Sequence, residues 1–82
     1  MKGVTKYDVN DVVWCCEYDE LDGYYHVIRR TIDYIKICLE NVYYGFVYGM
    51  EIPEEMCYEN KHSADIVCAI NNRHVDEWRV CM

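Results

Sequence analysis

Runs of β-branched and aromatic residues, alternating in places with polar ones, dominate the first two thirds of this 82-residue chain. Strands favour such residues and place successive side chains on opposite faces of a sheet. The pattern predicts strands over about residues 9–18, 24–39, 42–48 and 56–58. Between the last two strands, residues 49–55 read as a loop that contains the only proline, Pro53.

The second run is the centre of the predicted fold. Residues 24–48 contain no proline, and a polar break at Glu40 and Asn41 divides them into a long strand and a shorter returning strand. Alternation fails at residues 29–32, which predicts a bend or bulge that lets one strand serve both halves of a small barrel. Gly45 is expected to mark a close approach or a twist.

The first strand follows a turn at Asn10 and Asp11. Alternation puts Val13 and Cys15 on one face of this strand and Cys16 on the other. The acidic, glycine-containing segment 19–23 reads as a hairpin loop. Centring the hairpin near residues 20–22 places Cys16 opposite His26 and Cys15 opposite Val27.

A helix is predicted over about residues 61–73, with Asn60 as its N-cap. Its inward stripe, at three- and four-residue spacing, is Ala64, Val67, Cys68 and Asn71. Residues 74–82 read as a last strand or an ordered tail in which Trp78 and Val80 pack and Arg79 points outward. The predicted fold class is therefore α+β, mostly β: a single-domain, strongly bent barrel of 4–5 antiparallel strands with one C-terminal helix.

Charge narrows the choice of partners. The chain has 15 acidic and 8 basic residues, so its net charge is −7. Such a surface repels nucleic acid and attracts basic partners. Two interpretations stay open: a solvated face that keeps a small protein soluble, and a surface that occupies the nucleic-acid channel of a partner protein. The candidate partner-binding residues are Asp19, Glu20, Asp22, Tyr43, Tyr44, Glu54 and Glu55.

No segment has the apolar core of a signal peptide or the length of a membrane span, so a cytoplasmic location is predicted. The six cysteines are then expected to be thiols or metal ligands rather than a disulfide framework. Their even number would fit three bridges in an oxidising compartment.

A structural Zn²⁺ is the cofactor that the cysteines and histidines suggest, because zinc needs four such ligands and a small core benefits from a metal. The candidate ligands are Cys16, His26, Cys57 and His62, in two half-sites that meet if the last strand pairs with the first. A competing set is Cys68, His74 and Cys81. The alternative is that cysteines such as Cys15 and Cys38 pack as small apolar residues.

Catalysis is not expected. A cysteine enzyme needs a thiolate beside an oriented histidine, and Cys16 with His26 has no evident oxyanion hole nearby. The sequence also lacks a phosphate-binding glycine loop, an HExxH motif and a Ser-His-Asp arrangement.

Three segments carry a family resemblance: YDVNDVVW, YYHVIRRTIDYIKI and IPEEMCYENKHSADIVCAIN, together spanning about residues 7–72. They resemble small proteins encoded by phages and mobile elements of Gram-positive bacteria. Asn10 replaces the usual glycine of the first motif, and Cys57 stands where an aromatic residue is expected. The resemblance implies a Src-homology-3-like barrel with a C-terminal helix. Some small acidic proteins of this kind look like anti-CRISPR proteins that bind the RNA-guided nuclease of a type II system.

Two functional hypotheses follow. The first is a phage-encoded protein–protein inhibitor, specifically an anti-CRISPR protein that blocks DNA loading or cleavage by a type II nuclease. The second is a small zinc-stabilised structural or regulatory module. Direct nucleic-acid binding is disfavoured by charge, and a monomer or small homo-oligomer is expected.

Overall fold

The computed structural model describes residues 5–47 and 50–81 of the chain, the last of these by its backbone alone. The elements, in order, are β1 (Val12–Asp19), β2 (Tyr24–Cys38), β3 (Asn41–Phe46), β4 (Glu51–Pro53), the 3₁₀ turn η1 (Glu54–Met56), β5 (Cys57–Tyr58) and α1 (Lys61–Cys81). The strands form one antiparallel sheet in the order β4-β3-β2-β1-β5. The α+β, mostly β, prediction is confirmed. The sheet is not closed, so the term barrel fits only loosely.

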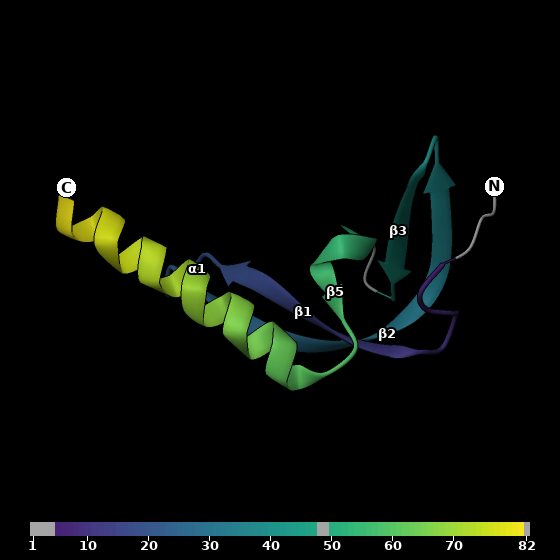
Figure 1. The fold of residues 1–82 in the computed structure, drawn as a ribbon, viewed down its shortest axis with the longest axis horizontal. Coiled ribbons are helices and arrows are strands. Elements are labelled where there is room, and N and C mark those ends of the chain that lie inside the picture. The colour runs from purple at the N-terminus through teal and green to yellow at the C-terminus, as the bar shows by residue number, and fades with distance from the viewer. Residues whose placement is uncertain (1–4, 48–49, 82) are drawn as a thin grey trace.

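The long strand β2 is shared by two hairpins (Figure 1). Its first half, up to Thr31, pairs with β1, and its second half, from Ile32, pairs with β3. The register shifts between Ile32 and Tyr34, so Asp33 is the extra residue of a bulge. Bulges bend a strand and increase its twist. The predicted bend is therefore present, one residue beyond the predicted 29–32 segment.

The core lies inside this bend. Its buried residues come from every strand: Val13, Cys15, Ile32, Tyr44, Phe46, Ile52 and Cys57. Val13 and Cys15 share the inward face of β1, as alternation predicted. β5 pairs with β1 at Trp14 and Cys15, so the last strand does meet the first.

Strand β4 falls within the segment predicted as a loop. Its three residues pair with β3, and Ile52 is buried at its centre. Pro53 closes this strand at the outer edge of the sheet, where a missing N–H costs no ladder hydrogen bond. The prediction of a loop over residues 49–55 is therefore wrong at residues 51–53.

Gly45 confirms its predicted role. It pairs with Tyr34, and a Cβ at Gly45 would lie 2.1 Å from the Tyr34 ring. The turn at Asn10 is also confirmed, since this residue has a φ of 77°. Asparagine tolerates the left-handed conformation that glycine prefers, which explains how Asn10 can replace a glycine.

The β1–β2 register differs from the prediction by one residue. Cys16 pairs with Val27, and His26 pairs with Glu17. Gly23 has a φ of 78° and its N–H donates to the Asp19 carbonyl, so Asp19 and Tyr24 close the hairpin around a four-residue loop. A shift of one residue turns every side chain to the opposite face of the sheet. Cys16 and His26 therefore lie on opposite faces.

The helix starts where predicted but is longer. Asn60 accepts a hydrogen bond from the Ser63 N–H at 2.8 Å, which confirms the N-cap. α1 continues to Cys81, so the predicted strand or tail at 74–82 is wrong for the described part of that segment. Residues 61–81 contain no glycine or proline that would end a helix.

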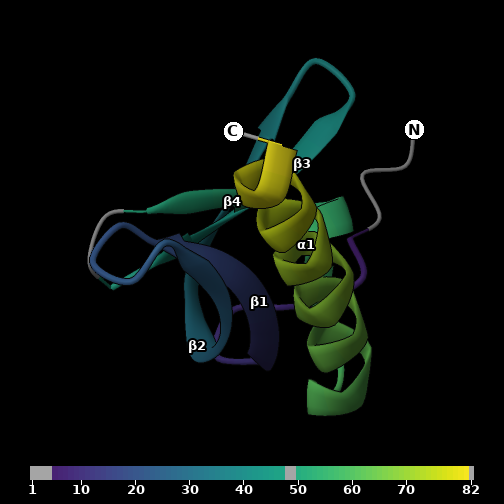
Figure 2. The same ribbon diagram turned by 90° about the vertical axis from the view of Figure 1, so that its left-hand side faces the viewer.

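Figure 2 shows α1 running alongside strands β1 and β2. Hydrogen bonds from side chains join the second half of α1 to the start of β2. The Asn72 amide brackets the backbone of Tyr25: its oxygen accepts from the Tyr25 N–H at 2.6 Å, and its NH₂ donates to the Tyr25 carbonyl at 3.0 Å. One helical turn later, the Tyr24 hydroxyl donates to Asp76 at 2.8 Å. In the described part of α1, only Ala64 and Cys68 are buried.

Candidate functional site

One end of the molecule combines acidic and exposed apolar side chains, and we call it the acidic end. It consists of the β1–β2 turn and the last described turns of α1: Asp19, Glu20, Leu21, Asp22, Asp76, Glu77, Trp78 and Val80. Three contacts hold the two segments together. They are the Tyr24–Asp76 hydrogen bond, the 3.4 Å hydrogen bond from Arg79 to the Gly23 carbonyl, and the Arg79 guanidinium 4.8 Å from the centre of the Tyr24 ring.

The apolar side chains of the acidic end are unusually exposed. Leu21 is 97% exposed, Val80 85% and Trp78 63%. The prediction that Trp78 and Val80 pack while Arg79 points outward is therefore wrong, because Arg79 faces Tyr24 and the other two face solvent. Tryptophan is among the residues enriched at the energetic centres of protein interfaces.

A groove of about 520 Å³ runs beside Trp78 along α1. It is lined by Tyr25, Asn71, His74, Val75, Glu77 and Trp78. Because its lining includes the aromatic rings of Tyr25 and Trp78 and the carboxylate of Glu77, this groove has the composition to receive an apolar or basic side chain of a partner.

The β1–β2 turn is fixed by its own acidic residues. Asp19 accepts a hydrogen bond from the Leu21 N–H at 2.8 Å, and Asp22 accepts one from the Tyr24 N–H at 2.9 Å. These local bonds are the Asx turns that acidic residues form in loops. Gly23 has a φ of 78°, which strains any residue with a Cβ, and a Cβ there would also force the end of the Arg79 side chain, 2.0 Å away, to move. Leu21 is thus presented by an ordered turn.

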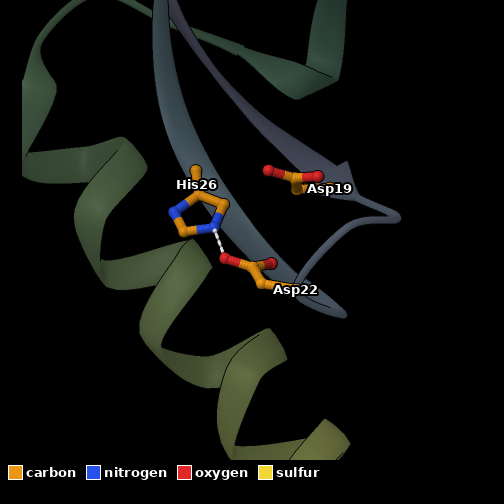
Figure 3. A group of neighbouring side chains, drawn as sticks. All are labelled: Asp19, Asp22 and His26. Carbon is orange, nitrogen blue, oxygen red and sulfur yellow. Dashed lines mark hydrogen bonds and ion pairs between the residues drawn. The ribbon is translucent and has the colours of Figure 1, made fainter.

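Asp19, Asp22 and His26 form a group with the spacing of metal ligands. Each offers one ligand atom, and these atoms lie within 4.8 Å of one another. Figure 3 shows the Asp22 carboxylate and the His26 ring pointing toward each other, with the Asp19 carboxylate across from them. Asp22 Oδ2 lies 2.7 Å from His26 Nε2. The hydrogen bond from the Tyr24 N–H, followed by that from His26, lowers the pKa of Asp22. The group could hold a metal ion.

The predicted zinc ligands do not form one site. Cys16 is separated from His26 by the sheet and lies beside Cys68, with 2.7 Å between the sulfur atoms. Cys57 is buried with its sulfur 4.0 Å from that of Cys15, whereas His62 is exposed on the first turn of α1. Within residues 5–47 and 50–80, three or more metal-binding side chains converge only at Asp19, Asp22 and His26.

The structure does not bring the competing set, Cys68, His74 and Cys81, together as a metal site within the described residues. The Cys68 sulfur contacts that of Cys16, and His74 lines the groove beside Trp78. The side chain of Cys81 lies outside the described residues.

The structure places the predicted partner-binding residues in different surroundings. Asp19, Glu20 and Asp22 belong to the acidic end, and Glu55 is exposed elsewhere. Tyr44 is completely buried, so its predicted role in partner contact is wrong. Its hydroxyl donates to Glu54 at 2.6 Å, and burial, followed by this hydrogen bond, raises the pKa of Tyr44 to about 12. Glu54 also accepts from the Lys6 N–H at 2.9 Å, so its carboxylate serves the fold. Tyr43 is half-buried.

The sequence argument missed Leu21, Asp76, Trp78 and Val80. The available signal was a leucine in the middle of an acidic turn and two large apolar residues in a charged segment. Only the length of α1 and its contact with Gly23 and Tyr24 bring these segments together.

No helix in the described part of the chain is both long enough and apolar enough to span a membrane. No protein-family model, curated protein or solved structure matches the sequence or the fold. The family resemblance of residues 7–72 therefore stays a prediction.

Proposed function

We propose that this protein is a protein–protein inhibitor that places its acidic end on a basic surface of a partner protein. The observation that carries the proposal is the exposure of Leu21, Trp78 and Val80 among carboxylates at one end of the molecule. Aromatic anchors such as tryptophan supply much of the affinity of an interface, neighbouring apolar contacts exclude water, and surrounding charges supply steering and specificity.

The partner is a nuclease of the RNA-guided type II kind, and the surface is part of its nucleic-acid path. Two observations support this target: the net charge of −7 and the resemblance of residues 7–72 to phage-encoded proteins. A channel that binds nucleic acid is lined with lysine and arginine, so an acidic protein competes for the same sites. The chain then acts in the cytoplasm of the bacterial host.

The proposed inhibition needs no chemical step. In support, the thiol best placed to be a nucleophile, that of Cys16, lies beside Cys68 and on the opposite face of the sheet from His26. The protein is therefore proposed to act by occupancy and not as an enzyme.

The test is binding to purified type II nucleases from several bacteria, followed by a DNA-cleavage assay with this protein in molar excess. The proposal expects a stable complex with at least one nuclease and loss of cleavage by it. Unimpaired cleavage by every nuclease tested would reject the target. A shift of labelled DNA by this protein alone, at physiological salt, would instead favour a nucleic-acid-binding role.

A zinc-stabilised structural module is the second candidate, and the Asp19–Asp22–His26 group is the observation that favours it. Zinc binds carboxylate oxygen and imidazole nitrogen. Titration of the metal-free protein with Zn²⁺ is expected to stabilise it, and His26→Ala to remove that effect. His62→Ala is the control, because His62 lies outside the group. Zinc stabilisation that survives His26→Ala would place the ion elsewhere, and its absence from the wild-type protein would leave the inhibitor as the sole candidate.

A further inference from the structure

Two of the cysteines sit at the interface between α1 and β1. Cys16 projects from the outer face of β1, and Cys68 projects from the buried face of α1. Their sulfur atoms are 2.7 Å apart. Non-bonded heavy atoms prefer separations of about 3.5–4.0 Å, and a disulfide bond measures about 2.05 Å. The two sulfurs therefore lie closer together than ordinary non-bonded atoms, at the interface between α1 and β1.

We propose that Cys16 and Cys68 are a redox-sensitive pair that closes a disulfide between β1 and α1. The pair is reduced in a reducing cytoplasm and oxidised by a small-molecule disulfide when the compartment becomes oxidising. The proposal is independent of the partner that the acidic end binds.

The other cysteines whose side chains the structure describes differ from this pair in the distance between their sulfurs or in access to solvent. Cys15 and Cys57 are cross-strand neighbours with sulfurs 4.0 Å apart, but both are buried in the core, at 1% and 4% exposure. A dissolved oxidant cannot reach them in the folded protein. Cys38 is exposed near the end of β2. Cys16 is half-buried, so an oxidant can reach its sulfur at the edge of the helix interface.

The surroundings of the two sulfurs indicate which thiol attacks the oxidant first. Burial, followed by the hydrogen bond to Cys16, raises the pKa of the Cys68 thiol to about 12, so Cys68 is the poorer first nucleophile. The Asn71 amide donates toward the Cys16 sulfur at 3.7 Å, and Cys16 is the more exposed of the two cysteines. Cys16 is the attacking thiol and Cys68 the resolving one.

The reaction with glutathione disulfide balances in two exchanges. The Cys16 thiolate attacks one sulfur of glutathione disulfide, a protein–glutathione bond forms, and one glutathione thiolate leaves. Cys68, as its thiolate, then attacks the Cys16 sulfur and releases the second glutathione. The protein loses two electrons and two protons, and the oxidant becomes two glutathione thiols.

The consequence of closure is a covalent link between parts of the fold that share little core. In the described part of α1, Ala64 and Cys68 are buried and Val67 and Val75 half-buried, and the hydrogen bonds of Asn72 and Asp76 to β2 add polar contacts. The bond would close a loop between residues 52 positions apart in sequence. Loops of this size give large disulfide stabilisation, so oxidation is expected to raise the melting temperature by roughly 10–20 °C.

The experiment incubates the folded, full-length protein in glutathione buffers of increasing disulfide fraction, then blocks free thiols and maps peptides by mass spectrometry. The expected result is a Cys16–Cys68 peptide and a melting temperature that rises with its yield. Cys68→Ala is expected to stop at a glutathione adduct on Cys16 and to lose the temperature rise. Cys38→Ala is the matched control, expected to behave as the wild type.

Two results would overturn the proposal. One is a wild-type protein that stays reduced, or keeps a stable adduct on Cys16, across the buffer series. The other is a bridge between different cysteines, which the Cys15→Ala and Cys57→Ala variants would identify. Because peptide mapping of the wild-type protein decides between these outcomes, the test does not depend on any variant folding.

Discussion

Two turns of this protein carry a leucine at the tip, and one of these leucines is also strained. Leu39 is 91% exposed and has a φ of 60°. The left-handed conformation costs a residue with a Cβ roughly 1–2 kcal/mol, and glycine avoids this cost. Leu39 is therefore an apolar side chain left in solvent, on a backbone conformation that leucine rarely adopts.

Replacing this leucine should stabilise the fold. We expect Leu39→Gly to raise the free energy of unfolding by about 1 kcal/mol, because strain relief exceeds the entropy that glycine adds to the unfolded chain. Urea denaturation measures the change. Ile37→Gly, on the strand two residues earlier, is the control and should destabilise. A destabilising Leu39→Gly would show that the Leu39 side chain has contacts that outweigh its strain.

A buried tyrosine and a half-buried glutamate couple the fold to pH. Tyr44 is inaccessible, and its hydroxyl donates to Glu54 while accepting from the Tyr7 N–H at 3.2 Å. Burial alone would raise the pKa of Glu54, but the hydrogen bonds from Lys6 and Tyr44 lower it below its usual value. A carboxylate with a lowered folded-state pKa stabilises the fold above its unfolded pKa of about 4.3. That stability is lost as the pH falls through the folded-state pKa.

Tyr44→Phe should separate this contribution from the rest of the core. At neutral pH we expect a loss of about 2 kcal/mol, since a hydrogen bond to a charged group is removed and the Tyr7 N–H is left unpaired. Below about pH 4 the difference from the wild type should narrow, because protonated Glu54 no longer gains from the hydroxyl. Urea denaturation across this range measures both. A loss that stays constant with pH would contradict the coupling to Glu54.

At the scale of single residues, the sequence predicted backbone conformation better than it predicted which side chains are buried. The turns at Asn10 and Gly23 and the close approach at Gly45 follow from residues whose backbone preferences are intrinsic. The burial of Tyr44 did not follow, because tyrosine is common both in sheets and at interfaces. Only its place opposite the bend of β2 decides between the two.

At the scale of elements, α1 rests on few apolar contacts and on the Asn72 amide. Asn72 satisfies both backbone groups of Tyr25, in the half of β2 that pairs with β1. Without Asn72, a donor and an acceptor of half-buried backbone would need new partners.

We therefore expect Asn72→Ala to lower the free energy of unfolding by about 2 kcal/mol and to increase hydrogen exchange at the Tyr25 amide and in the C-terminal half of α1. Hydrogen exchange with mass spectrometry localises the effect. Arg73→Ala, at an exposed position, should leave both quantities near the wild-type values. Unchanged exchange at Tyr25 in Asn72→Ala would mean that Asn72 does not hold α1 in place.

Helices and strands were predictable from the sequence where a single local feature, such as an N-cap residue or a break in alternation, defines them. The bent β2, the N-cap at Asn60 and the pairing of β5 with β1 all agree with expectations from the sequence. The predicted zinc site failed because the β1–β2 register differs from the predicted one by one residue, which places Cys16 and His26 on opposite faces of the sheet. The predicted end of the helix was wrong because Trp78 and Val80 suggested a packed strand. The sequence has no glycine or proline between Lys61 and Cys81 that would end the helix.

At the scale of the whole molecule, the two turns lie at opposite ends of β2 and differ in their surroundings. The β1–β2 turn is joined to α1 by the hydrogen bond from Arg79 to the Gly23 carbonyl, whereas the β2–β3 turn extends away from the helix (Figure 1). Exposed apolar side chains ringed by charge are typical of an interaction site.

Charge at this end should govern the rate of binding. We expect Glu20→Gln to lower the association rate constant with a basic partner severalfold at low salt, and the difference to shrink at high salt. Glu40→Gln removes the same charge from the other turn and should have a smaller effect. Stopped-flow or surface-plasmon measurements at two salt concentrations provide the comparison. Equal effects of the two substitutions would assign steering to net charge instead of the acidic end.

The central claim is that the acidic end binds a partner protein and thereby inhibits it. The most direct measurement is the dissociation constant of the complex with an inhibited type II nuclease for the wild type, Trp78→Ala and Ile66→Ala. Ile66 is a matched control, because it is a half-exposed apolar residue on α1 outside the acidic end. We expect Trp78→Ala to weaken binding by about 30-fold, equivalent to about 2 kcal/mol, and Ile66→Ala to leave it unchanged. Equal affinities for all three proteins, or no binding by the wild type, would contradict the claim.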